Sequence, residues 1–206
     1  MKATMKTLSA ILICCFISTI QMYGENIQRP ESENYVKGVE ALNEGNPEAA
    51  YTYLNAEINE HPDNGYAHCY MALICNFCND IKLALKALNS SLELIPEADT
   101  EYRSFAHYSR GVLLSNLKMW ERAEADLNEA IRLNPEDVEN YKSRAQLYFE
   151  TERYEESLDD LTRALKLDSK ADVNDLVLQL MAVAPTSEFM ERITATYQQL
   201  DQVTVH

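Results

Sequence analysis

Residues 109–137 read SRGVLLSNLKMWERAEADLNEAIRLNPED, and the same pattern occurs four times along the chain. A proline closes each of the first three copies, at Pro62, Pro96 and Pro135. The first interval is 34 residues, and the second, 39 residues, holds the same period plus the insertion DTEYR at positions 99–103. A period near 34 residues indicates stacked helix–turn–helix units, because one such unit has too little apolar surface to bury alone.

The composition predicts one all-α domain. The 206 residues are 46% hydrophobic and 25% charged, which is typical of a globular domain with a continuous core. Only 5 Gly and 6 Pro interrupt a sequence rich in Ala, Leu and Glu, and this composition favours helices.

Four positions of the repeat predict how its two helices meet. With the closing proline at place 32 of 34, the units are 31–64, 65–98, 104–137 and 138–171. Small residues let two antiparallel helices approach closely, and aliphatic side chains fill the space between layers. Place 8 is small (Gly38, Ala72, Gly111, Ala145), as is place 20 (Ala50, Ala84, Ala123, Ser157), while place 24 is Leu (Leu54, Leu88, Leu127, Leu161) and place 28 is aliphatic (Ile58, Leu92, Ile131, Leu165).

These positions resemble the tetratricopeptide repeat family over residues 31–171, and the unit quoted above is the clearest copy. The resemblance implies a right-handed superhelical solenoid of about four units that binds other proteins and carries out no catalysis. The sequence departs from the family pattern at place 4, where the first three units lack the usual large aromatic residue, and Ser169 replaces the closing proline of the fourth unit.

A pair of places predicts ion pairs between the helices of a unit. The third unit has Arg110 at place 7 and Asp126 at place 23, and the fourth has Arg144 and Asp160. The second unit is apolar at both places, with Met71 and Ala87 in the frame given above. Because in the third and fourth units a charge at one place accompanies the opposite charge at the other, we expect each Arg to meet its Asp.

The insertion and the C-terminal region extend this pattern. DTEYR contains no Gly or Pro, so it predicts an extra turn at the front of the next helix, with Asp99 or Thr100 as its cap. Apolar side chains at helical spacing on either side of Pro185 predict two C-terminal helices, over residues 172–201, that cap the open end of the solenoid.

The N-terminus has the pattern of a secretory signal peptide over residues 1–24. Lys2 and Lys6 precede an apolar run at 8–20 that is too short to span a bilayer comfortably. The sequence therefore predicts an exported protein, periplasmic, secreted or associated with the envelope, with no membrane span in its mature form. Residues 12–15 (LICC) loosely resemble a bacterial lipobox, which leaves lipid anchoring as an alternative.

The net charge restricts the partners. Removing residues 1–24 takes away two lysines and no acid, so the formal charge of −15 becomes −17. This charge repels phosphate backbones and anionic lipids, and we therefore expect a protein or peptide partner and no nucleic acid.

The cysteines give the main chemical alternative. Cys75 and Cys78 have the CxxC spacing of redox motifs, but they lie at the end of a predicted helix, where the helix dipole does not lower a thiol pKa. A Cys75–Cys78 disulfide, a thiol-redox role and a metal site that includes His68 remain alternatives to core packing. No phosphate-binding loop or nucleophile elbow is present, so we predict no enzymatic activity, no cofactor and no metal.

The tetratricopeptide resemblance also implies which residues line the concave face. It places an aromatic groove at Tyr66, Phe77, Phe105 and Tyr108, and the structural alternative is that several of these rings pack inside. Lys142 alone fits the basic clamp by which some family members bind chaperone tails, so that partner is not expected. The leading prediction is a groove that holds a partner segment, and the alternative is self-association of solenoids as an envelope assembly protein. The predicted partner-binding residues are Tyr66, Leu73, Asn76, Phe77, Phe105, Tyr108, Val112, Asn116, Lys142 and Gln146.

Overall fold

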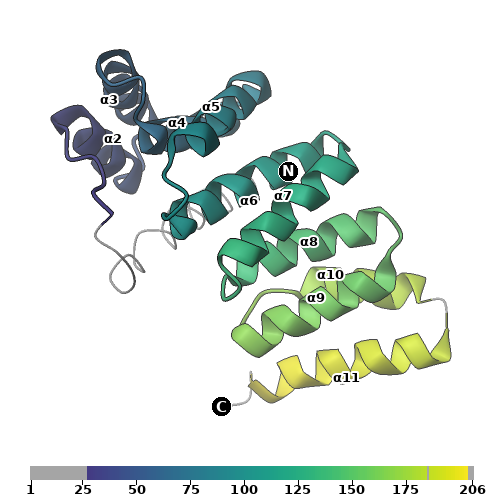
Figure 1. The fold of residues 1–206 in the computed structure, drawn as a ribbon. Helices are drawn as coiled ribbons and strands as arrows, with labels where there is room; N and C mark the ends of the chain where they lie inside the picture. The colour runs from purple at the N-terminus through teal and green to yellow at the C-terminus, as the bar shows by residue number, and fades with distance from the viewer. Residues whose placement is uncertain (1–26, 185, 204–206) are drawn as a thin grey trace. The chain divides into compact units, whose positions relative to one another are not determined.

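The computed structural model describes residues 27–184 and 186–203 (Figure 1). This part of the chain contains ten α-helices and no strand, which confirms the all-α prediction. The predicted signal peptide and Pro185 lie outside the described residues. The helices are α2 (Glu33–Asn43), α3 (Pro47–Glu60), α4 (Gly65–Phe77), α5 (Ile81–Leu94), α6 (Thr100–Asn116), α7 (Trp120–Leu133), α8 (Val138–Glu150), α9 (Tyr154–Leu167), α10 (Asn174–Val183) and α11 (Ser187–Val203).

The chain divides into two compact units, residues 1–106 and 107–206, with the boundary inside α6. In the first unit α2 packs against α3 and α4 against α5, and α3 also contacts α4. In the second unit α8 packs against α9 and contacts α7. Each pair joins consecutive helices through a short turn, as the repeat pattern predicts.

The small residues at place 8 permit close helix pairing. A Cβ atom added to Gly38 would lie 2.7 Å from Cγ of Leu54, and one added to Gly111 would lie 2.9 Å from Cγ of Leu127. Both leucines are fully buried. In the fourth unit the hydroxyl of Ser157 donates a hydrogen bond of 2.8 Å to the carbonyl of Ala145, so places 8 and 20 are in direct contact.

The turn between the paired helices has the same backbone form in all four units. Place 15 has positive φ each time: 72° at Gly45, 61° at Asn79, 58° at Lys118 and 62° at Glu152. The next residue then donates its N–H to a carbonyl five residues earlier, at 2.8 to 2.9 Å, which satisfies the open end of the helix. Only the first repeat has glycine at this place. The other three repeats therefore hold a residue with a Cβ atom in the left-handed backbone conformation.

The insertion forms the predicted extra turn. Helix α6 begins at Thr100, and Oδ1 of Asp99 accepts a hydrogen bond of 3.3 Å from the N–H of Tyr102. Asp99 is only 1% exposed, which is unusual for a capping aspartate.

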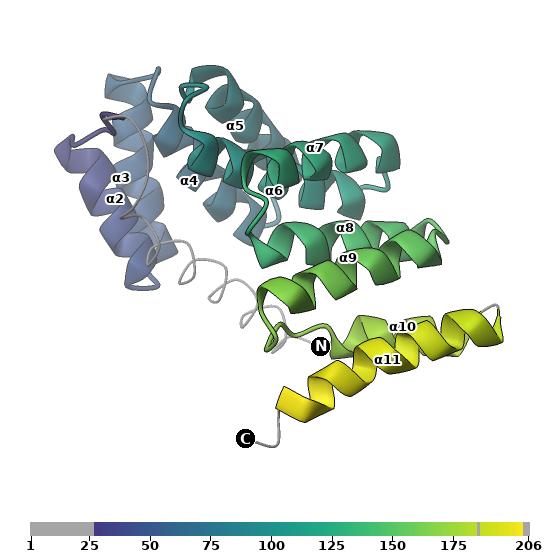
Figure 2. The ribbon, with the colours of Figure 1, turned by 60° about the horizontal axis from the view of Figure 1, so that its bottom comes forward.

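The last two helices bury their apolar faces against the fourth unit. Helices α10 and α11 both contact α9 (Figure 2). The shared core includes Val177, Leu180, Phe189 and Ile193. The hydroxyl of Thr186 accepts a hydrogen bond of 3.1 Å from the N–H of Phe189 and so caps α11. Among the described residues no helix combines the length and the apolar character that a membrane crossing requires.

Candidate functional site

The ten predicted partner-binding residues fall into three groups by exposure. Tyr66, Phe105 and Tyr108 are buried, so the expectation of an open aromatic groove is wrong for three of its four rings. Leu73, Val112 and Lys142 are half-buried, whereas Asn76, Phe77, Asn116 and Gln146 are exposed. Phe77 is 50% exposed and is the one ring of the four that remains available to a partner.

The buried rings fill the space between neighbouring helices. Tyr108 of α6 hydrogen bonds with Ser143 of α8, and burial raises its pKa. The hydroxyl of Tyr66 donates a hydrogen bond of 2.9 Å to Oδ2 of Asp99. These contacts correspond to the alternative in which the rings pack against the following unit.

Four buried tyrosines form a cluster in the first unit. The rings of Tyr66 and Tyr102 meet edge to face at 4.8 Å between centroids, and the hydroxyls of Tyr70 and Tyr102 are 2.9 Å apart. Tyr35 lies beside Tyr70, with 6.1 Å between ring centroids. Burial is the main cause of a raised pKa in all four, so they are neutral phenols at physiological pH.

Arg29 lies on this cluster, and the sequence analysis missed it. Its Nε and Nη2 donate to Asp99 at 3.1 and 3.3 Å, and Nη2 also donates to Glu101 at 2.9 Å. Its guanidinium carbon stands 4.5 Å from the centroid of the Tyr102 ring. Arg29 precedes the first repeat, and the acidic residues belong to the insertion, so the repeat frame contains neither side of this contact.

In the second unit, the predicted ion pair of the third repeat is present with an additional partner. Nε and Nη2 of Arg110 each lie 2.7 Å from an oxygen of Asp126. Nδ1 of His107 also lies 2.9 Å from Oδ1 of Asp126, a contact that the sequence did not indicate. Burial acts to raise the pKa of Asp126, but the hydrogen bonds and charges of Arg110 and His107 outweigh it, so the pKa lies below the ordinary aspartate value.

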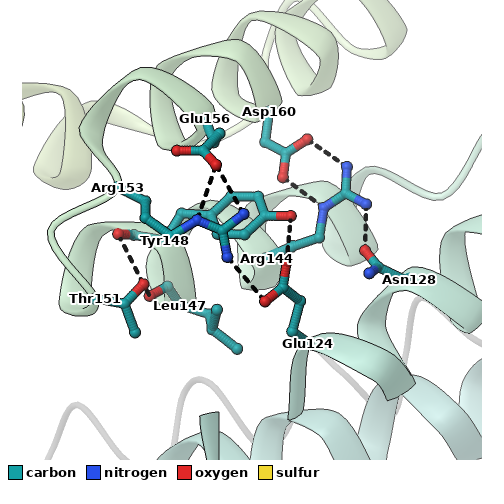
Figure 3. A network of polar contacts seen from close by, with 9 residues as sticks. All are labelled: Glu124, Asn128, Arg144, Leu147, Tyr148, Thr151, Arg153, Glu156 and Asp160. Atoms are coloured by element: carbon teal, nitrogen blue, oxygen red, sulfur yellow. Dashed lines mark hydrogen bonds and ion pairs between the residues drawn. The ribbon is translucent and has the colours of Figure 1, made fainter. Parts of the chain in front are cut away.

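The corresponding pair of the fourth repeat belongs to a wider network (Figure 3). Nε and Nη2 of Arg144 lie 2.8 and 2.7 Å from Asp160, and Nη1 donates to Asn128 at 2.6 Å. Beside it, Glu124 accepts hydrogen bonds from Tyr148 and Arg153 at 3.1 and 2.8 Å (Figure 3).

These contacts join α7, α8 and α9 through their side chains. The guanidinium carbon of Arg153 also lies 4.1 Å from the centroid of the Tyr148 ring. Because each charge of the network is paired within the protein, we interpret it as a device that fixes the register of three helices.

The cysteines do not form the predicted alternative disulfide. Cys75 and Cys78 are both free thiols, Cys75 buried and Cys78 exposed. Burial is the main cause of a raised pKa for Cys75, and it raises the pKa of Cys69 to about 12. A redox cysteine requires a lowered pKa, so the raised pKa values argue against thiol catalysis at Cys69 and Cys75.

His68 has a structural contact. Its Nε2 lies 3.0 Å from the carbonyl oxygen of Pro62, which assigns the ring to the turn before α4. Within residues 27–184 and 186–203 there is no group of three or more His, Cys, Asp or Glu side chains with the spacing of a metal site.

Comparison with known proteins identifies the repeats. Residues 104–137 and residues 139–170 each match the tetratricopeptide repeat family. Residues 104–170 are thus a pair of tetratricopeptide repeats. The first of these matches coincides with the third unit of the sequence frame, and the second lies within the fourth.

The chain is similar in sequence to one relative and in fold to two solved structures. The chain is 31% identical over 87 residues to the lipoprotein NlpI homolog of Haemophilus influenzae, which is 42% of this chain but only 28% of that protein's length. The fold is similar to MamA from Desulfovibrio magneticus RS-1 (TM-score 0.66, 19% identity, 82% of this chain and 94% of that one). It is also similar to YrrB, described as a TPR protein with an unusual peptide-binding site (TM-score 0.60, 20% identity, 71% of this chain and 73% of that one).

Proposed function

We propose that this protein is a non-enzymatic interaction module that holds a segment of another protein outside the cytoplasm. The observation that carries the proposal is the exposure of Phe77, an aromatic ring at the end of α4 in a protein whose other predicted groove rings are buried. A half-exposed aromatic ring is costly to leave in water and supplies contact area at low entropic cost. Asn76 beside it is exposed and has a side-chain amide that suits an extended backbone.

The second unit offers polar contacts for the same purpose. Asn116 and Gln146 are exposed, and Gln146 donates a hydrogen bond of 2.9 Å to Glu150 on its own helix. Lys142 is half-buried and donates to Glu139 at 2.8 Å, one turn away. The surface of α8 therefore presents a neutral amide, Gln146, and an ion pair, Lys142 with Glu139, which favours hydrogen bonding to a peptide over binding of a phosphate.

Two observations support a location outside the cytoplasm. The first is the signal-like pattern of residues 1–24. The second is the name of the relative from Haemophilus influenzae, a lipoprotein, with which this chain shares 87 aligned residues. The same name supports lipid anchoring through the lipobox-like residues 12–15 as the alternative to a freely exported form.

The test compares two exposed aromatic residues of the first unit. Phe77→Ala removes the proposed contact on α4, and Tyr51→Ala, whose ring is 44% exposed on α3, is the matched control. Wild type and both variants are immobilised and exposed to cell-envelope extract, and the retained proteins are quantified by mass spectrometry. Circular dichroism establishes that all three forms have the same helix content.

We expect proteins that are retained by wild type and Tyr51→Ala to be lost with Phe77→Ala. Equal retention by all three forms would show that Phe77 contacts no partner. A molecular mass that rises with protein concentration in light scattering, and that Phe77→Ala returns to the monomer, would replace the proposal with self-association.

A further inference from the structure

The contact of Arg29 with Asp99, Glu101 and Tyr102 has the features of a ligand-binding site. Residues 27–32 form no helix, and they bring Arg29 to acidic residues 70 and 72 positions later in the sequence, within the first unit. The repeat architecture does not require this contact, because α2 to α5 form their pairs without it. We therefore treat Asp99, Glu101 and Tyr102 as the site and residues 27–32 as the segment bound to it.

Asp99 is fixed in place without Arg29. Its Oδ2 accepts the hydroxyl of Tyr66 at 2.9 Å, and its Oδ1 accepts the N–H of Tyr102 at 3.3 Å. With Arg29 in place Asp99 is 1% exposed, so the guanidinium and the two neutral donors, and not water, surround the carboxylate. Two neutral donors hold it but do not balance its charge, and a buried, unbalanced carboxylate strongly favours a cation.

The geometry selects a guanidinium group over an ammonium group. Arg29 presents Nε and Nη2 to the two oxygens of Asp99, at 3.1 and 3.3 Å, and places a further hydrogen bond of 2.9 Å on Glu101. The guanidinium carbon also stands 4.5 Å from the centroid of the Tyr102 ring. A planar fork satisfies two carboxylates and an aromatic ring at once, whereas a lysine ammonium group is a single point charge.

We propose that Asp99, Glu101, Tyr66 and Tyr102 form an arginine-binding site, that Arg29 is its displaceable internal ligand, and that an arginine side chain of a partner protein takes its place. This inference rests on the proposed interaction function and names the chemistry of the partner. Arg29 is 26% exposed, so the site is open to solvent on one side. The formal charge of −15 attracts a basic segment and raises the rate of encounter.

The test uses the chain's own segment as the probe. A dye-labelled peptide of residues 27–32 (IQRPES) is titrated against the full chain with Arg29→Ala, and binding is followed by fluorescence polarisation. Peptides with citrulline or lysine in place of arginine are the matched probes, because citrulline keeps the shape of arginine and loses its charge. Arg29→Ala combined with Asp99→Asn is the matched protein control, since asparagine retains the helix cap and removes the charge.

We expect the arginine peptide to bind Arg29→Ala and to bind wild type about 10-fold more weakly, because Arg29 then occupies the site for about nine-tenths of the time. The citrulline and lysine peptides, and the double variant, should show at least about 10-fold weaker binding than the arginine peptide with Arg29→Ala. Should Arg29→Ala fail to fold alone, the arginine peptide in excess should restore its helical circular dichroism, and the citrulline peptide should not.

Three results would overturn the inference. Equal binding, or equal restoration of helix, by the arginine and citrulline peptides would show that the site does not recognise a guanidinium group. No binding to wild type at about 100 times the Kd of Arg29→Ala would make Arg29 a permanent tether. A wild-type dimer that Arg29→Ala abolishes would assign the site to a second copy of this chain. None of these results depends on Phe77, so they are separable from failure of the interaction function itself.

Discussion

The ion pair between Arg110 and Asp126 leads to a prediction about coupling. In the second repeat, residues 65–98, the same two places hold Met71 and Ala87, so the protein itself contains the apolar replacement. We therefore consider Arg110→Met, Asp126→Ala and the double variant. The side chain of Asp126 is 8% exposed and that of Arg110 is 22% exposed, so the carboxylate depends more strongly on the pair than the guanidinium does.

The expected free energies follow from these exposures. Breaking a fully buried pair by removing one partner costs about 3 to 5 kcal/mol. In Arg110→Met the contact with His107 remains, so we expect a loss of about 2 to 3 kcal/mol, and in Asp126→Ala the arginine turns toward water at a cost of about 1 to 2 kcal/mol. The double variant leaves no charge unpaired and should lose only about 1 kcal/mol, which corresponds to a coupling of about 2 to 4 kcal/mol.

Trp120 provides the assay, because it is the only tryptophan of the chain and begins α7, the helix that carries Asp126. Urea unfolding followed by the fluorescence of Trp120 reports on the second compact unit, residues 107–206. With an m value of about 2 kcal/mol/M, Arg110→Met should lower the midpoint by about 1 to 1.5 M. A double variant that is as unstable as the sum of the two single variants would refute the reasoning, because the two side chains would then act independently.

Two further predictions concern pH and helix capping. Since the pKa of Asp126 is lowered in the folded protein, its stabilisation is complete above about pH 4 and is lost as the pH falls through the folded-state pKa. In Asp126→Asn the free energy of unfolding, followed by Trp120 fluorescence, should therefore depend less on pH below about pH 4. An unchanged dependence on pH would contradict the pairing. Asn64→Ala should cost about 2 to 4 kcal/mol, because Asn64 caps α4 and also donates to buried Glu57 at 2.8 Å. Asn46→Ala removes only an exposed cap and should cost about 1 kcal/mol in thermal unfolding, so equal losses would refute this difference.

The helices and their pairing were predictable because the contacts within one repeat join residues that are close together in the sequence. Places 8 and 24, or 7 and 23, lie on two helices joined by a short turn, so the contacts of Gly111 with Leu127 and of Arg144 with Asp160 follow from the frame alone. The extra turn before Tyr102 was predictable for the same reason, since a capping aspartate acts on the next few residues.

The sequence by itself determined the all-α fold, the four helix pairs and the partners that lie within one pair. Only the tertiary structure decided which aromatic residues are open to a partner: Tyr108 is covered and Phe77 is not, although both stand at places that face the groove in this family. It alone also brought Arg29 to Asp99, across 70 residues, and His107 to Asp126. The physical reason is that a repeat frame specifies the direction of a side chain from its own helix, whereas burial and long-range charge pairing depend on what the neighbouring helices and the preceding segment place against it.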